Sequence, residues 1–184
     1  NTIRSYLAKG PFEKIDEDHP AVVEAKASVT ERIEKFLSIN GERSVDSFHR
    51  ELGNIMWEYC GMERTDEGLR TAIEKIRALR EDFWANVRIP GDVNDMNQVL
   101  EYGLRVAEYI DLGELMCVDA LDRDESCGAH FREDHLTEDG EAERDDENWC
   151  FVSAWEPGAN KNEFIRHAEP LYFDSIPLMT RNYK

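Results

Sequence analysis

The sequence lacks long apolar runs, paired cysteine motifs and an excess of positive charge. No uninterrupted apolar stretch approaches the ~20 residues of a membrane-spanning helix, so we expect no direct insertion into a membrane. The four cysteines, at positions 60, 117, 127 and 150, form no C-x-x-C pair, which is typical of reduced cytosolic thiols rather than of a disulfide framework. The formal net charge is −18. Such a chain repels phosphate backbones and anionic lipid head groups, so we expect no nucleic-acid partner.

Motifs of nucleotide-binding and hydrolytic enzymes are also absent. The chain contains no G-x-S-x-G, P-loop or G-x-G-x-x-G sequence. Ser47 and His49 share one helical pattern but do not face each other, so they make no nucleophile–base pair. We therefore predict no catalytic and no cofactor-binding residue in this chain. It begins with Asn rather than Met and shows no signal peptide, so we expect a processed protein or a part of a longer one.

Apolar residues make up 41% of the chain and recur every three or four positions, which predicts a helical core. Four helices are expected, over about 20–40, 45–60, 66–89 and 94–121. Their predicted N-caps are Asp18 or His19, Ser44, Thr65 or Asp66, and Asn94 or Asp95. The predicted buried stripe of the first helix consists of Val22, Ala25, Val29, Ile33, Phe36 and Leu37.

The predicted fold class is mainly α. An up-down antiparallel bundle of three or four helices, similar to a spectrin repeat, is expected over residues 20–123. Residues 1–19 are expected to form an irregular lead-in, and 124–184 an acidic loop followed by a small antiparallel β-hairpin. The hairpin strands are expected over 149–155 and near 164–165, with a possible third strand at 171–173. A hairpin of this size is marginal by itself, so it should lie on another part of the protein.

Two local patterns carry further expectations. Gly103 and Gly113 fall inside the longest predicted helix, which favours either close approach of another backbone or a kink. Arg77, Arg80 and Arg88 form a weak basic run, which we interpret as a solvated face.

The segment 126–149 gathers His, Arg and clustered carboxylates. Cys127, His130 and His135 could bind zinc, but their order fits no common zinc spacing, and we predict no metal site. The acidic pairs could serve as general acid and base or bind calcium, but no EF-hand pattern is present. A solvated acidic loop is the simplest interpretation. The alternative is a loop fixed to a partner by Arg132 and Arg144.

The same segment resembles a known family. The text DRDESCGAHFREDH…ERDDENW, over 122–149, is similar to the C-terminal signature of the flavoprotein subunit of succinate dehydrogenase and fumarate reductase. HRELGNIMWEYCGMERTDEGL at 49–69 and LEYGLRVAEYIDLGELMCVDAL at 100–121 resemble helices of the same subunits. The signature match consists of Gly128, Ala129, His130, Arg132, Glu133, Asp134, Arg144, Asp145, Asp146, Glu147 and Trp149. Cys127 departs from it, because the family usually has Arg at that position.

The resemblance implies the C-terminal helical domain of a bacterial flavoprotein subunit. Such a parent interconverts succinate and fumarate at FAD and exchanges electrons with an iron–sulfur subunit. Its FAD and dicarboxylate sites precede the helical region, so no cofactor is expected in this fragment, and the isolated chain is not expected to be active. The resemblance implies flavin-binding and capping domains, an iron–sulfur subunit and a membrane anchor as partners. It also implies a peripheral, cytoplasmic position on the inner membrane.

The implied role of this chain is structural docking. The candidate interface consists of Cys127, His130, Arg132, Glu133, Asp134, Arg144, Asp145, Asp146 and Trp149. The alternative hypothesis is a free-standing acidic helical protein-interaction module, which the charge and the bundle also allow.

Overall fold

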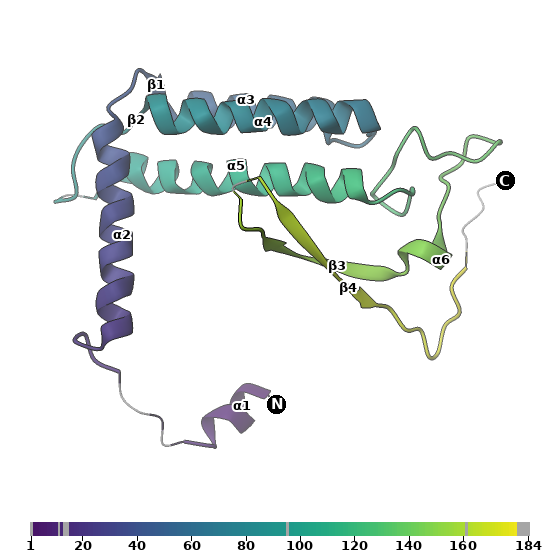
Figure 1. Cartoon of the computed structure of the whole chain (residues 1–184), viewed down its shortest axis with the longest axis horizontal. Coiled ribbons are helices and arrows are strands. Elements are labelled where there is room, and N and C mark those ends of the chain that lie inside the picture. The colour runs from purple at the N-terminus through teal and green to yellow at the C-terminus, as the bar shows by residue number, and fades with distance from the viewer. Residues whose placement is uncertain (1, 11, 13–14, 95, 161, 180–184) are drawn as a thin grey trace.

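The computed structural model describes residues 2–10, 12, 15–94, 96–160 and 162–179. Its centre is an antiparallel bundle of three helices, α3 (Val45–Tyr59), α4 (Asp66–Asn86) and α5 (Gln98–Asp122). A fourth helix, α2 (Pro20–Ile39), runs across one end of the bundle (Figure 1). The C-terminal region contributes α6 (Asp146–Trp149) and a hairpin of β3 (Phe151–Pro157) and β4 (Phe164–Pro170). The predicted class, a helical bundle followed by a hairpin, is confirmed.

The helices begin at side chains that accept hydrogen bonds from free backbone N–H groups. Ser44 accepts from Ser47, and Thr65 accepts from Gly68, as the sequence predicts. The cap of α5 is Asn97, which accepts from the backbone N–H of Leu100 at 3.0 Å. This helix therefore begins later than the predicted Asn94 or Asp95, of which Asp95 lies outside the described residues.

Short parallel strands close the end of the bundle near α2. β1 (Arg43–Ser44) leads into α3, and β2 (Val87–Arg88) follows α4, so α4 ends at Asn86 rather than near Pro90. Phe36 of α2 packs here against Phe83 and Trp84, with ring centroids 5.8 and 4.7 Å apart. Phe36 and Phe83 are both fully buried, so this aromatic contact joins α2 to the bundle.

The predicted buried stripe of α2 is wrong in its first half. Phe36 is the one residue of this helix that is fully buried, and Ile33 and Leu37 pack beside it. Val29 is 59% exposed. The reason is geometric, because α2 crosses the bundle and only its last turns reach the core (Figure 1).

The two glycines of α5 face side chains rather than another backbone. A Cβ at Gly103 would lie 2.8 Å from Ile89 Cδ1, and a Cβ at Gly113 would lie 3.2 Å from Leu52 Cδ1. Glycine is favoured at both positions because side chains from neighbouring elements fill the space that a larger residue would need. The expected close approach of another backbone is therefore wrong.

The hairpin lies on the bundle. Trp155 donates from Nε1 to Asp119 Oδ1 at 2.7 Å, and Arg166 pairs with Asp122 at 2.8 Å, so both strands are attached to the last turns of α5. Residues 171–173, the possible third strand, form no strand. The lead-in expected to be irregular contains a short helix, α1 (Thr2–Leu7). Among the described residues, no helix combines the length and the apolar character needed to cross a membrane.

Candidate functional site

The segment 126–149 is held together from inside by Arg132, which is 1% exposed. Its guanidinium forms a bidentate ion pair with Asp134, from Nε to Oδ1 and from Nη2 to Oδ2, both at 2.8 Å. Nη1 donates to the carbonyl oxygen of Ala120, at the C-terminal end of α5, at 3.1 Å. Ser126 accepts from the Arg132 backbone N–H at 2.8 Å and donates to its carbonyl oxygen at 3.0 Å. Arg132 therefore has no free surface to offer to a partner.

Asp134 extends this contact to a second helix. Its Oδ2 accepts from the backbone N–H of Asp66, the first residue of α4, at 2.9 Å. The Arg132 guanidinium holds the pKa of the Asp134 carboxyl well below its usual range. A carboxylate is favoured at a helix N-terminus, and a guanidinium is favoured at a helix C-terminus. The Arg132–Asp134 pair thus connects the end of α5 with the start of α4.

His130 is held in one neutral tautomer. Arg64 donates from Nη1 to His130 Nδ1 at 2.9 Å, so this nitrogen carries no proton, and Nε2 lies 3.0 Å from the Arg123 carbonyl, to which it donates. Burial lowers the pKa of His130, and the nearby positive charges of Arg64 and Arg132 act in the same direction. His130 therefore acts here as a neutral connector.

A tight turn precedes His130. The backbones of Cys127 and His130 exchange two hydrogen bonds, at 2.8 and 3.1 Å, and Gly128 has a φ of +61°. Only glycine adopts such an angle without cost. Cys127, the residue that departs from the family pattern, is half-buried in this turn.

Glu125 is a buried residue of this segment that the sequence analysis missed. It is 2% exposed, and its Oε1 accepts from Nε and Nη2 of Arg123 at 2.9 and 2.6 Å. Its Oε2 accepts from the Asp145 backbone N–H at 2.8 Å. This contact fixes the start of α6, where Asp145 caps the helix by accepting from Asn148. The only sequence signal was the i, i+2 spacing of Arg123 and Glu125.

The remaining predicted interface residues lie nearer the surface. Arg144 pairs with Asp146 at 2.6 Å inside the segment itself. Trp149 is half-buried beneath Arg166, whose guanidinium carbon lies 5.3 Å from the ring centroid. Glu133 is exposed. Most of the predicted interface residues therefore form their contacts with other residues of this chain.

A second buried charge cluster lies between α4 and α5. Glu114 is fully buried, and its carboxylate accepts from Arg77 Nε at 2.6 Å and from Arg80 Nη1. Arg80, 5% exposed, also donates to Asn162 Oδ1 at 2.7 Å, so the cluster fixes the turn between β3 and β4. The interpretation of Arg77 and Arg80 as a solvated face is therefore wrong. The missed signal was Glu114 itself, a charged residue on the apolar stripe between Ile110 and Cys117.

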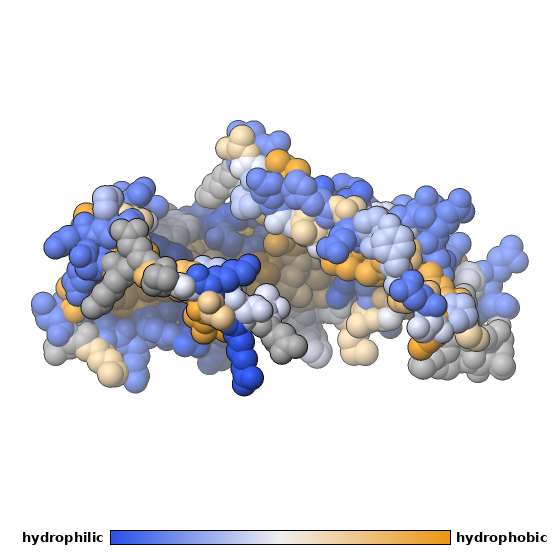
Figure 2. All heavy atoms as spheres, turned by 90° about the horizontal axis from the view of Figure 1, so that it is seen from below, coloured by the Kyte–Doolittle hydropathy of each residue, from blue (hydrophilic) through white to orange (hydrophobic). Residues whose placement is uncertain are grey.

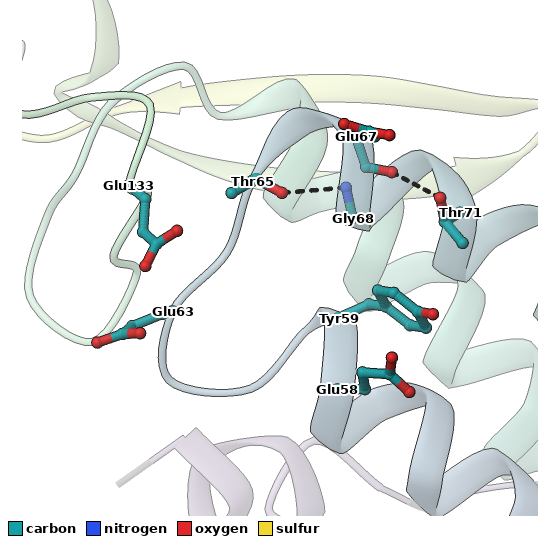
Figure 3. Close-up of a pocket in the computed structure, with 8 residues that line it drawn as sticks. All are labelled: Glu58, Tyr59, Glu63, Thr65, Glu67, Gly68, Thr71 and Glu133. Atoms are coloured by element: carbon teal, nitrogen blue, oxygen red, sulfur yellow. Dashed lines mark hydrogen bonds between the residues drawn. The ribbon is translucent and has the colours of Figure 1, made fainter.

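The open side of the segment borders an acidic hollow of about 520 Å³. Figure 3 shows Glu133 and Glu63 on one side of it, and Glu67 of α4 and Glu58 of α3 on the other. No group of three or more His, Cys, Asp or Glu side chains in the described part of the chain is arranged to hold a metal ion. His135 pairs with Asp124 at 2.8 Å, so the zinc hypothesis for Cys127, His130 and His135 has no geometric support.

Comparisons with known proteins identify a family and several relatives. The sequence profile described as "Fumarate reductase flavoprotein C-term" matches residues 49–183. The fumarate reductase flavoprotein subunit of Escherichia coli strain K12 is 34% identical over 130 residues, covering 70% of this chain and 21% of that protein. An uncharacterized FAD-dependent oxidoreductase of Methanocaldococcus jannaschii is 30% identical over 112 residues, covering 61% and 20%.

The structural comparison agrees. Quinol fumarate reductase from E. coli superposes with a TM-score of 0.74 at 29% identity, covering 96% of this chain and 28% of that chain. The chain thus spans about a fifth of the length of the curated relatives it matches.

Proposed function

The chain belongs to the family of fumarate reductase flavoprotein C-terminal domains, and we propose that it is the structural docking domain of an FAD-dependent subunit that interconverts succinate and fumarate. In this proposal the domain binds the flavin-binding and capping domains of its own subunit. Through them it joins an iron–sulfur subunit and a membrane anchor on the cytoplasmic face of the inner membrane. The chemistry takes place outside the 184 residues.

The proposed location of the flavin follows from the kinds of element present. Dinucleotide sites of the Rossmann type are built where a glycine-rich turn joins a parallel strand to a helix. The parallel pairing among the described residues consists of β1 with β2, which are two residues each, and an isolated bridge between Arg64 and Arg132. These residues do not fit the pyrophosphate of FAD, so no step of the reaction is assigned to them.

The observation that carries the docking proposal is the uncovered apolar face of α2. Its first turns border a groove of about 590 Å³ lined by apolar residues that include Ile15, Val22, Ala25 and Val29. Apolar patches interleaved with charged side chains are also visible on the face of the molecule seen in Figure 2. Exposed apolar surface of this extent commonly marks an interface. The proposed occupant is the remainder of the same subunit, because the relatives carry this fold within chains about five times as long.

The segment 126–149 has a supporting role in this proposal. Buried Arg132 and Glu125 keep the segment rigid against α4 and α5. The surface-facing members, Glu133, Asp146 and Trp149, are proposed to contact the flavin-binding domain. A rigid segment loses little conformational freedom when it binds, which favours docking.

Two measurements test the proposal. The purified chain should bind no FAD, whereas a yellow, reducible, stoichiometric flavin complex of this chain alone would overturn the assignment of chemistry to other domains. Sequencing the codons upstream of Asn1 gives the second test. A reading frame that encodes a G-x-G-x-x-G flavin domain is expected, and a start codon near Asn1 would instead favour a free-standing acidic interaction module.

A further inference from the structure

Three sulfur atoms meet where α3 ends against α5. Cys60 is the C-cap of α3 and is 6% exposed, and Cys117 lies in α5 and is fully buried. The two thiols are close enough to hydrogen-bond to each other. Met56 Sδ lies 3.8 Å from Cys117 Sγ, and the Met56 carbonyl accepts from the Cys60 backbone N–H at 3.0 Å. The contact joins two helices that are far apart in the sequence.

We propose that Cys60 and Cys117 are a redox modification site that forms a reversible disulfide when the chain meets hydrogen peroxide. The Cys60 thiolate attacks one peroxide oxygen, the O–O bond breaks, and the departing hydroxide takes a proton to become water. The product is Cys60 sulfenic acid. Cys117 sulfur then attacks the Cys60 sulfur, the S–O bond breaks, and the hydroxyl leaves as water with the Cys117 proton. Two thiols are oxidised, and one peroxide is reduced to two waters.

The surroundings assign different roles to the two thiols. The hydrogen bond from Cys117 lowers the pKa of Cys60 to about 7, and the positive charge of Arg64 acts in the same direction. The same contact and burial raise the pKa of Cys117. The thiolate is the reactive form. Because Cys60 is 6% exposed at the end of α3 and Cys117 is fully buried, peroxide reaches Cys60 first, and Cys117 keeps its proton until the second step.

The bond would act on the docking segment. Arg64, four residues after Cys60, accepts from the Glu133 backbone N–H at 2.9 Å, and its own N–H donates to the Phe131 carbonyl at 3.1 Å. A disulfide from Cys60 to Cys117 would fix this connection to α5. This inference does not depend on the proposed docking, because it concerns contacts inside this chain.

The experiment uses the complete chain with hydrogen peroxide as the probe. After oxidation, free thiols are blocked with N-ethylmaleimide, and the protein is digested and analysed by mass spectrometry. The expected result is the loss of two of the four thiols, a mass decrease of two hydrogens before blocking, and one peptide pair linking Cys60 to Cys117. Dithiothreitol should restore both thiols.

The other two cysteines provide the internal control. Cys127 and Cys150 are more exposed, so accessibility alone predicts that they react first. The double variant Cys127→Ser/Cys150→Ser should still form the bond, and Cys117→Ser should stop at a Cys60 sulfenic acid that dimedone traps. A Cys127–Cys150 link, links between chains, or oxidation that spares Cys60 would overturn the proposal. The wild-type peptide map decides even where a variant fails to fold.

Discussion

The bundle and the crossing helix α2 differ in where their partners lie. In the bundle and in the segment 126–149 that packs on it, buried charges meet opposite charges within the chain, as Glu114 meets Arg77 and Arg80, and Arg132 meets Asp134. The first turns of α2 carry an apolar stripe that the described residues do not bury, and Val29 is 59% exposed. Both regions have the periodicity of buried helices. The difference teaches that periodicity identifies a face to be covered but does not say which molecule covers it.

The largest expected effect belongs to the charge cluster of the bundle. Glu114→Ala should destabilise the chain by about 4 kcal/mol, because it leaves the buried Arg80 without its main counter-charge. Urea denaturation followed by circular dichroism measures the free energy of unfolding. The matched control is Glu108→Ala on the same helix, whose carboxylate is 64% exposed and pairs with Arg32 at 3.4 Å. A loss of less than about 1 kcal/mol is expected there. Equal losses at the two positions would remove the contrast.

Arg132→Ala should have the next largest effect, about 3 kcal/mol. The substitution leaves Asp134 without its ion pair and the Ala120 carbonyl without a donor. Because Asp134 retains some contact with water, the effect should be smaller than that at Glu114. Arg50→Ala, at an exposed i, i+4 pair with Asp46, is the control and should change stability by less than about 0.5 kcal/mol. If Arg132→Ala behaved like its control, the segment 126–149 would not be held by this pair.

The helix starts at Ser44 and Thr65 could be predicted from sequence because a cap acts within three residues. The resemblance to the family depended on the local amino-acid sequence of residues 122–149. By contrast, the pairing of Glu114 with Arg80 joins positions 34 residues apart on two helices. The partner of a charged residue on an apolar stripe can be identified only when the facing helix is known. For the same reason the apolar stripe of α2 could be detected from the sequence, but its first half was wrongly expected to be buried within this chain.

A smaller effect is expected from pH at His130. Its pKa is lowered in the folded chain, so the unfolded chain binds a proton first as the pH falls. The neutral ring contributes its full stability above the unfolded pKa of about 6.5, and this contribution is lost as the pH falls toward the lower folded pKa. His130→Asn should therefore be destabilising at pH 7.5, and the gap to the wild type should narrow at pH 5. Urea denaturation at both values measures the gap. A gap that stays constant or widens would contradict the neutral tautomer.

The smallest effect on stability is expected on the open side of α2, where Val29→Glu should change the free energy of unfolding by no more than about 0.5 kcal/mol. Phe36→Ala, two turns along the same stripe, removes a fully buried ring and should cost about 3 kcal/mol. In the complete subunit, Val29→Glu should instead weaken the attachment of this domain to the flavin-binding domain. The measurement is the rate at which a protease releases the domain, which should increase. Ser28→Glu, at an exposed position next to Val29, is the control for added charge. Two outcomes would contradict α2 as the docking surface: destabilisation of the isolated chain by Val29→Glu, or a complete subunit as resistant to proteolysis with Val29→Glu as with Ser28→Glu. A charge introduced on a docking surface should be destabilising only where the partner domain covers that surface.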